Sequence, residues 1–140
     1  MNDLEAEVLA ANAAFYRAFA TRDVAAMEAL WASEAPIACT HPAWPVLVGR
    51  RDVLRSWRGI LENPDAPSVE QRGAVVHLAG DAAIVLCREL VNDTPLEATN
   101  VFVREDGAWR IVHHHASAVA PNVRERLTGG DAFSEFGGRN

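Results

Sequence analysis

The sequence predicts an α+β protein, with helices packed on one face of an antiparallel sheet. In its first half, apolar residues recur at spacings of three and four, which is the helical period. After residue 68 the chain becomes rich in Val, Ile and Thr, and turn residues interrupt it at three places. Long strands with such short connections favour an antiparallel meander. With 140 residues, the chain has the length of one domain.

Three helices are expected in the first half of the chain. The first covers residues 2–21, whose apolar side chains form a single stripe. Asp23 caps a second, shorter helix, and residues 49–63 form the third. Between the second and third helices, residues 37–40 are expected as a short strand, and two prolines exclude regular structure from residues 41–45.

Four strands are expected after the third helix. They are residues 68–79, 82–92, 96–105 and 108–118. Residues 1–120 therefore form the predicted domain, and residues 121–140, which are mostly polar and carry two Gly-Gly pairs, form a C-terminal extension. Within the extension, residues 121–128 are expected as a short helix, and Phe133 and Phe136 are expected to dock on protein.

The turn at residues 105–107 sets the predicted pairing of the last two strands. A three-residue loop with glycine in the left-handed position pairs Arg104 with Ala108, whereas a two-residue Asp-Gly turn shifts the pairing by one residue. We favour the longer loop. It places on one face Ala98, Asn100, Phe102, Arg110, Val112, His114 and Ala116. It places on the other face Thr99, Val101, Val103, Trp109, Ile111, His113 and His115.

The second of these faces is also apolar, because it carries Val101, Val103, Trp109 and Ile111. Helices can cover only one face of the sheet in a chain of this length. A symmetric partner subunit is therefore expected to cover the other face, which predicts a homodimer.

Three polar residues are expected to meet in the interior as candidate catalytic groups. Asn100 and His114 share the face under the helices, and Glu89 on the neighbouring strand is expected to join them. A carboxylate, an amide and an imidazole inside an apolar pocket are typical of a small-ligand site. Burial raises the pKa of Glu and lowers that of His, which suits proton transfer near neutral pH. The alternatives are a satisfied hydrogen-bond network with a structural role and a surface charge pattern.

The irregular segment is expected to supply an aromatic wall to the same pocket. Trp44 lies there beside His41, and loops carry function more often than cores do. Trp44 is therefore a candidate contact for an apolar or planar ligand, with His41 as a further polar group. The expected ligand-binding lining is completed by Trp57, Phe102 and Val112.

Composition and motifs argue against several classes of function. The chain has no lysine, so no lysine Schiff base can form, and no phosphate loop or dinucleotide fingerprint is present. The formal net charge of −6 disfavours nucleic acid as a partner. Residues 113–115 are all histidine, but neighbours on a strand point to opposite faces and cannot converge on one ion. Neither a metal nor a cofactor is therefore expected.

The same features favour a cytoplasmic protein without a membrane partner. No unbroken apolar run reaches the length of about 18 residues that a membrane span needs. The start MNDLEAEV does not have the form of a secretory signal. Cys39 and Cys87 lie in apolar neighbourhoods and are expected as reduced, buried thiols.

Three segments resemble SnoaL-like proteins of the nuclear-transport-factor-2-like superfamily. NVFVREDGAWRIVHHHAS resembles the last hairpin of that family, and AFATRDVAAMEALWA resembles its first helical corner. THPAWPVLVGRRDVLRSW resembles the segment that precedes and begins the third helix. The resemblance covers about residues 5–119. It implies a cone-shaped α+β fold, in which three N-terminal helices pack on a curved antiparallel sheet that encloses a pocket, usually in a homodimer.

The resemblance also implies a range of functions. Members include ketosteroid isomerase, scytalone dehydratase, limonene epoxide hydrolase, polyketide cyclases and non-catalytic binding domains, and the kinase association domain is similar. The arginines in that association domain's pocket correspond here to Glu89, Asn100 and Ala116, so the same anion binding is not expected. An isomerase's aspartate base and tyrosine acid are not expected either, because Tyr16 is the only tyrosine and lies on the first helix.

Three functions stand as hypotheses. The first is a small-molecule-binding domain whose pocket takes an apolar ligand. The second is a cofactor-free isomerase, dehydratase or cyclase that acts on an apolar carbonyl or polyketide-like substrate. In it, Glu89 or His114 is the base and Asn100 donates to a developing enolate oxygen. The third is an association module whose function is the dimer itself.

Overall fold

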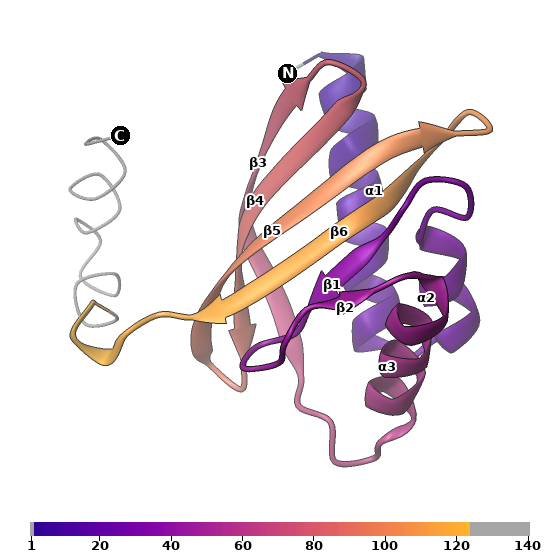
Figure 1. Cartoon of the computed structure of the whole chain (residues 1–140). Coiled ribbons are helices and arrows are strands. Elements are labelled where there is room, and N and C mark those ends of the chain that lie inside the picture. Colours follow the sequence, from indigo (N-terminus) through magenta and orange to yellow (C-terminus); the bar gives the residue numbers. More distant parts are fainter. Residues whose placement is uncertain (1, 124–140) are drawn as a thin grey trace.

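The computed structural model describes residues 2–123, which form helices packed on one curved sheet (Figure 1). The helices are α1 (Asp3–Ala20), α2 (Val24–Leu30) and α3 (Arg50–Glu62). The strands are β1 (Ala38–Thr40), β2 (Leu47–Val48), β3 (Val69–Ala79), β4 (Ala82–Val91), β5 (Thr94–Glu105) and β6 (Ala108–Ala118). Their order in the sheet is β2-β1-β6-β5-β4-β3, and β1 runs parallel to β6 while the other neighbours are antiparallel. The predicted α+β class is confirmed.

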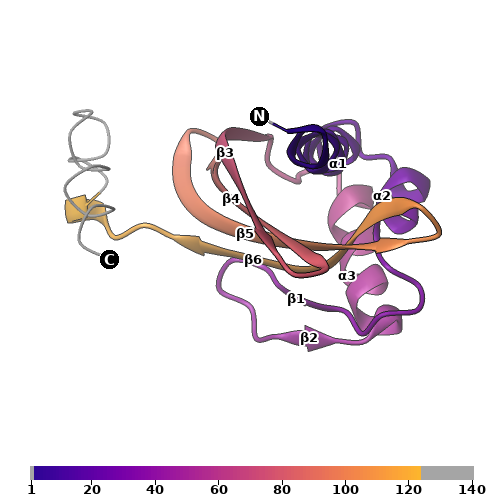
Figure 2. The same cartoon turned by 90° about the horizontal axis from the view of Figure 1, so that it is seen from above.

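The helices begin where the sequence predicted caps. The side chain of Asn2 accepts the backbone N–H of Glu5 at 2.8 Å, and that of Asp23 accepts the N–H of Ala26 at 3.0 Å. Seen from above, β3 to β6 curve around the side on which α1 lies (Figure 2). The predicted meander therefore wraps its concave face over α1, and the core is formed between them.

The hairpin between β5 and β6 differs from the prediction. Glu105 pairs with Ala108, so the loop has the two residues Asp106 and Gly107, both at positive φ (52° and 78°). This geometry is that of the tight turn for which Asp-Gly is favoured. The predicted three-residue loop, with its pairing of Arg104 and Ala108, was wrong.

A β-bulge corrects the register further along the hairpin. Phe102 pairs with Ile111, but Val101 pairs with His113, so Val112 is an extra residue on β6. Beyond the bulge, Asn100 lies directly opposite His114. The turn and the bulge each shift β6 by one residue, and together they return His114 to the face that was predicted for it.

The predicted faces were wrong for the part of β6 that precedes the bulge. Ile111 is fully buried, and Trp109 donates its indole N–H to Glu7 on α1 at 3.2 Å. Arg110 pairs with Val103 on the opposite face. The face proposed for a dimer, with Val101, Val103, Trp109 and Ile111 together, is therefore not formed.

Two charged side chains hold the segment between α2 and β1, Glu105 from β5 and Arg50 from α3. The exposed carboxylate of Glu105 accepts the backbone N–H groups of Ser33, Glu34 and Ala35 at 2.8–3.0 Å. The guanidinium of Arg50 donates to the carbonyl oxygen of Ala32 at 2.9 Å, beyond the end of α2. These bonds fix the segment that leads from α2 into β1, and with it the position of the irregular loop that follows.

The C-terminal extension is described only at its start. Residues 121–123 are helical, and the rest of the short helix predicted for residues 121–128, together with Phe133 and Phe136, lies outside the described residues. Within residues 2–123, no helix is long and apolar enough to cross a membrane.

Candidate functional site

A cluster of five polar side chains lies under α1 against the sheet. Each is no more than 5% exposed, and they come from α1, β4, β5 and β6. The members are Asn12, Tyr16, Glu89, Asn100 and His114. Glu89, Asn100 and His114 come together on one inner face, while the open cavity and the catalytic roles expected for them stay predictions. Burial of five polar groups is costly unless they bond one another, so their contacts decide what the cluster can do.

Asn100 is the centre of the cluster. Its amide nitrogen Nδ2 donates to Oδ1 of Asn12 at 2.9 Å and to the hydroxyl of Tyr16 at 3.1 Å. Its Oδ1 accepts from Nδ1 of His114 at 2.6 Å. The orientation of the Asn100 amide is therefore fixed, because its nitrogen bonds side chains of α1 and its oxygen bonds a side chain of β6.

These contacts set the proton positions on His114. Because Nδ1 carries the proton that Asn100 accepts, Nε2 of a neutral ring holds a lone pair. That Nε2 lies 3.8 Å from Oε2 of Glu89. Burial, reinforced by the nearby histidines, lowers the pKa of His114 to about 3, so the ring is neutral at physiological pH.

Tyr16 and Glu89 form a second short contact in the cluster. The Tyr16 hydroxyl donates to Oε2 of Glu89 at 2.6 Å and also lies 3.4 Å from the Cys87 sulfur. Burial raises the pKa of Glu89 and raises that of Tyr16 well above its ordinary range. A carboxyl with a raised pKa beside a neutral imidazole can take up and return a proton nearer neutral pH than an exposed glutamate.

Tyr16 and Asn12 were missed by the sequence reasoning. Both are buried on the same side of α1 as Val8 and Phe15, because residues 8, 12 and 16 lie four apart. The sequence signal that could have identified Asn12 and Tyr16 is that both are polar residues on the apolar stripe of the first helix. Tyr16 was not assigned to the site from the sequence, yet its hydroxyl contacts both Glu89 and Asn100.

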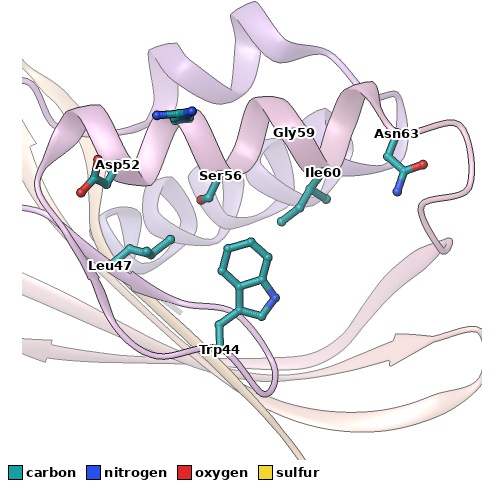
Figure 3. Close-up of a pocket in the computed structure, with 8 residues that line it drawn as sticks. Trp44, Leu47, Asp52, Ser56, Gly59, Ile60 and Asn63 are labelled. Carbon is teal, nitrogen blue, oxygen red and sulfur yellow. The ribbon is translucent and has the colours of Figure 1, made fainter.

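A surface hollow lies on the other side of α3, between this helix and the loop that joins β1 to β2 (Figure 3). Its volume is about 490 Å³. We call it the Trp44 hollow, and its lining residues are Trp44, Leu47, Asp52, Arg55, Ser56, Gly59, Ile60 and Asn63. The Trp44 indole faces α3 and is 46% exposed, which is unusual for so large an aromatic ring.

His41 connects the Trp44 hollow with the buried cluster. The Ser56 hydroxyl donates to the carbonyl oxygen of Val53 at 2.7 Å, so its oxygen accepts from Nε2 of His41 at 2.8 Å. Burial lowers the pKa of His41 to about 4, which keeps the ring neutral. The ring centroid of His41 lies 4.9 Å from that of Trp44 and 6.5 Å from that of His114. The His41 ring therefore lies between Trp44 at the surface hollow and His114 in the interior.

The predicted ligand-binding residues fall into two groups. His41 and Trp44 lie together at the hollow, as described above. Trp57 and Phe102 are no more than 1% exposed and are part of the packed core, while Val112 is half-buried at the bulge. These three residues do not line the hollow, because Trp57 lies on the buried side of α3 and Phe102 and Val112 lie on β5 and β6.

The two cysteines are free and buried, as the sequence predicted. Burial raises the pKa of Cys39 to about 12 and also raises that of Cys87. Neither thiol is therefore ionised as a nucleophile would need to be. Among residues 2–123, no group of three or more His, Cys, Asp or Glu side chains could hold a metal ion.

Residues 8–121 match the model of the SnoaL-like domain, and the chain belongs to this family. A crystal structure from Streptomyces avermitilis, described as a candidate dehydratase of the NTF2-like family, is 34% identical and has a TM-score of 0.76. The match covers 81% of this chain and 94% of that one. The resemblance inferred from the sequence is thereby confirmed.

Other relatives carry different descriptions. A structure from Thiobacillus denitrificans, described as a candidate calcium/calmodulin-dependent protein kinase type II association domain, is 34% identical, with a TM-score of 0.69 over 80% of this chain and 94% of that one. The F-box protein SKIP8 of Arabidopsis thaliana is 25% identical over 114 residues, which are 80% of this chain. The chain spans about half (49%) of the length of this curated relative. The family thus supports a ligand-binding or enzyme-like domain without selecting a ligand.

Proposed function

We propose that this chain is a small-molecule-binding domain whose ligand lies in the Trp44 hollow. The main support for this proposal is Trp44, a half-exposed tryptophan that lines a hollow of about 490 Å³. This volume lies within the range of roughly 300–1,000 Å³ found for small-molecule sites. An indole in such a position offers a large apolar contact at little cost in conformational freedom.

The lining fits a ligand with an apolar body and a few polar groups. Trp44, Leu47 and Ile60 supply apolar walls on two sides of the hollow. The Ser56 hydroxyl is a polar group in the lining supplied by α3, and its bonds to His41 and Val53 fix its position. A planar molecule between Trp44 and α3 would be held by contact on both faces.

Fluorescence titration with naphthalene-2-carboxamide, a neutral planar probe, tests this proposal. We expect Trp44→Leu to weaken binding at least tenfold, because the substitution removes the aromatic wall. Val46→Ala is the matched control, because Val46 is 57% exposed in the same loop and is not among the lining residues. Equal binding by the wild type and by Trp44→Leu would contradict the proposal.

A second candidate, proton-transfer catalysis, is favoured by the 2.6 Å contact between Tyr16 and Glu89. In this function the Glu89 carboxylate removes an acidic C–H proton of an apolar carbonyl compound, and Asn100 or Tyr16 exchanges its present hydrogen bond for one to the enolate oxygen. The substrate would have to pass His41, whose ring separates the cluster from the hollow. The related structure described as a candidate dehydratase is in keeping with such chemistry.

Deuterium exchange at the α-carbon of 2-tetralone, followed by NMR in D₂O, tests the catalytic candidate. The wild type should accelerate exchange, and Glu89→Gln should abolish the acceleration. Glu97→Gln is the control, because Glu97 pairs with Arg88 and is exposed outside the cluster. Exchange that is no faster with wild type than with Glu89→Gln would exclude Glu89 as the base.

Self-association is proposed on the sheet face that points away from α1. Pairings across the strands place Ile84 beside Val101 and Val75 beside Leu86 there. Val75 and Leu86 are 51% and 40% exposed. Light scattering at micromolar concentration should find a homodimer, and Leu86→Glu should dissociate it while Leu4→Glu on α1 should not. A monomeric wild type would contradict this proposal.

A further inference from the structure

We infer that the ligand of the Trp44 hollow is an aromatic carboxylate. The inference rests on the proposed function, since it names the chemical class of the molecule that the hollow binds. Around the hollow, the acceptor side chains already have partners in the protein, whereas several donors do not.

The acceptor groups of the hollow are engaged within the protein. The Ser56 oxygen accepts from His41 and its proton is given to Val53. Oδ1 of the Asp52 carboxylate accepts from Nε of Arg51 at 3.1 Å, and this ion pair offsets the negative charge of the carboxylate. Oδ1 of Asn63 accepts the backbone N–H of Asp65 at 2.9 Å. A ligand that offered only hydrogen-bond donors would therefore find few free partners here.

The donor groups, in contrast, are free among residues 2–123. Arg55 makes no ion pair with a described residue, although it lines the hollow. The bond to Asp65 fixes the Asn63 amide, and its free Nδ2 points to the side on which Trp44 lies (Figure 3). The Trp44 indole N–H has no hydrogen-bond partner in the described part of the chain. The hollow thus presents donors, one of them cationic, around apolar walls.

The spacing of the donors bounds the ligand. Arg55 and Asn63 lie eight residues apart on and just beyond α3, which corresponds to about 12 Å along a helix axis. Gly59 lies between them, and a Cβ atom there would meet nothing within 4 Å. A flat ring therefore fits over Gly59, opposite Trp44, while its carboxylate reaches the Arg55 guanidinium. Arg is the residue best suited to bind a carboxylate through two parallel hydrogen bonds.

Comparison of naphthalene-2-carboxylate with naphthalene-2-carboxamide tests the inference, because the two probes differ in charge and scarcely in shape. The wild type should bind the carboxylate about tenfold more tightly than the amide. Arg55→Gln should reduce this ratio to near one and leave the Kd of the amide unchanged. Arg72→Gln, which removes the same charge from a 68% exposed side chain on β3 outside the lining, should keep the preference.

The outcomes separate the inference from the proposed function. If both probes bind with equal affinity, or if Arg55→Gln leaves the preference intact, the assignment of a carboxylate is overturned and the binding function stands. If neither probe binds to the wild type, the proposed function fails and the inference fails with it. The preference should also weaken as salt is added, since an exposed ion pair is screened.

Discussion

Asn100 and His114 face each other across β5 and β6, and Oδ1 of Asn100 accepts the Nδ1 proton of His114 at 2.6 Å. Burial keeps the imidazole neutral, and this bond fixes its tautomer, so that the Nε2 lone pair lies on the side of Glu89. The bond depends on the bulge at Val112, which brings His114 opposite Asn100. The bulge, together with the two-residue turn, therefore determines which ring nitrogen of His114 carries the proton.

The stability of the cluster is predicted to depend on Asn100. Asn100→Leu removes partners from Asn12, Tyr16 and His114 at once and leaves buried polar groups unbonded. We expect a loss of at least about 2 kcal/mol in the free energy of unfolding, measured by urea denaturation. Thr99→Val, on the neighbouring half-buried position that faces away from the cluster, should change stability far less. A change of similar size in both variants would contradict the role of the network.

The buried histidines predict a decline in stability at acidic pH. The pKa values of His114 and His41 are lowered to about 3 and about 4 in the folded state, against about 6.5 in the unfolded chain. The unfolded chain therefore takes up protons first, and stability is lost as pH falls below about 6.5. The loss is on the order of 2 kcal/mol for each histidine over two pH units.

Urea denaturation between pH 7 and pH 4.5 measures this dependence, and His114→Gln should flatten it. Glu89 acts in the opposite direction, because its raised pKa favours the folded state at low pH and disfavours it as pH rises. Glu89→Gln should therefore steepen the acid decline. Parallel curves for the wild type and His114→Gln would show that His114 is not buried in the neutral form.

Gly59 offers a test in which stability and binding separate. It lies within α3, where glycine is unfavourable, and its side-chain position is open. Gly59→Ala should raise the free energy of unfolding by up to about 1 kcal/mol. Gly59→Leu should remain folded, because its side chain extends into open space, but it should occupy the hollow and abolish binding of the naphthalene probes. Undiminished binding by Gly59→Leu would place the ligand elsewhere.

The link between Glu105 and the segment after α2 predicts a local effect. The backbone hydrogen bonds from Ala35, Ser33 and Glu34 lower the pKa of Glu105. The ionised carboxylate therefore stabilises the fold at any pH above the ordinary pKa of glutamate, and this contribution is lost as the pH falls through the lowered pKa. Glu105→Gln should lower the melting temperature at pH 7 and increase amide exchange at Ala35. Asp106→Asn at the adjacent turn should leave the exchange at Ala35 unchanged, and equal exchange in both variants would contradict the link.

The sequence was sufficient to predict the helices and the meander, whereas His114 was placed beside Asn100 only because the wrong turn and the missed bulge cancelled each other. Local signals specify these features: the cap at Asp23, the apolar periodicity and the turn residues. The bulge at Val112 has no such signal, because no glycine or proline marks it, and the type of turn at Asp106 and Gly107 depends on the pairing of the whole hairpin.

The site was predicted only in part, for a related reason. Tyr16 joins Glu89 from a helix 73 positions away in sequence, so its role follows from the packing of α1 and not from any local motif. The Trp44 hollow likewise depends on how α3 faces the loop between β1 and β2. Trp57 was expected to line the pocket, yet its ring lies 5.4 Å from that of Phe15 in the core.

The central claim is that a small aromatic molecule binds in the Trp44 hollow, and NMR chemical-shift mapping tests it most directly. In a ¹H–¹⁵N spectrum recorded during titration with naphthalene-2-carboxylate, we expect the largest shifts at the Trp44 indole N–H and at the backbone amides of Gly59 and Ile60. Saturable shifts confined to those positions would support the claim. An unchanged Trp44 signal, with shifts located instead around Leu86 on the sheet face that points away from α1, would contradict the claim.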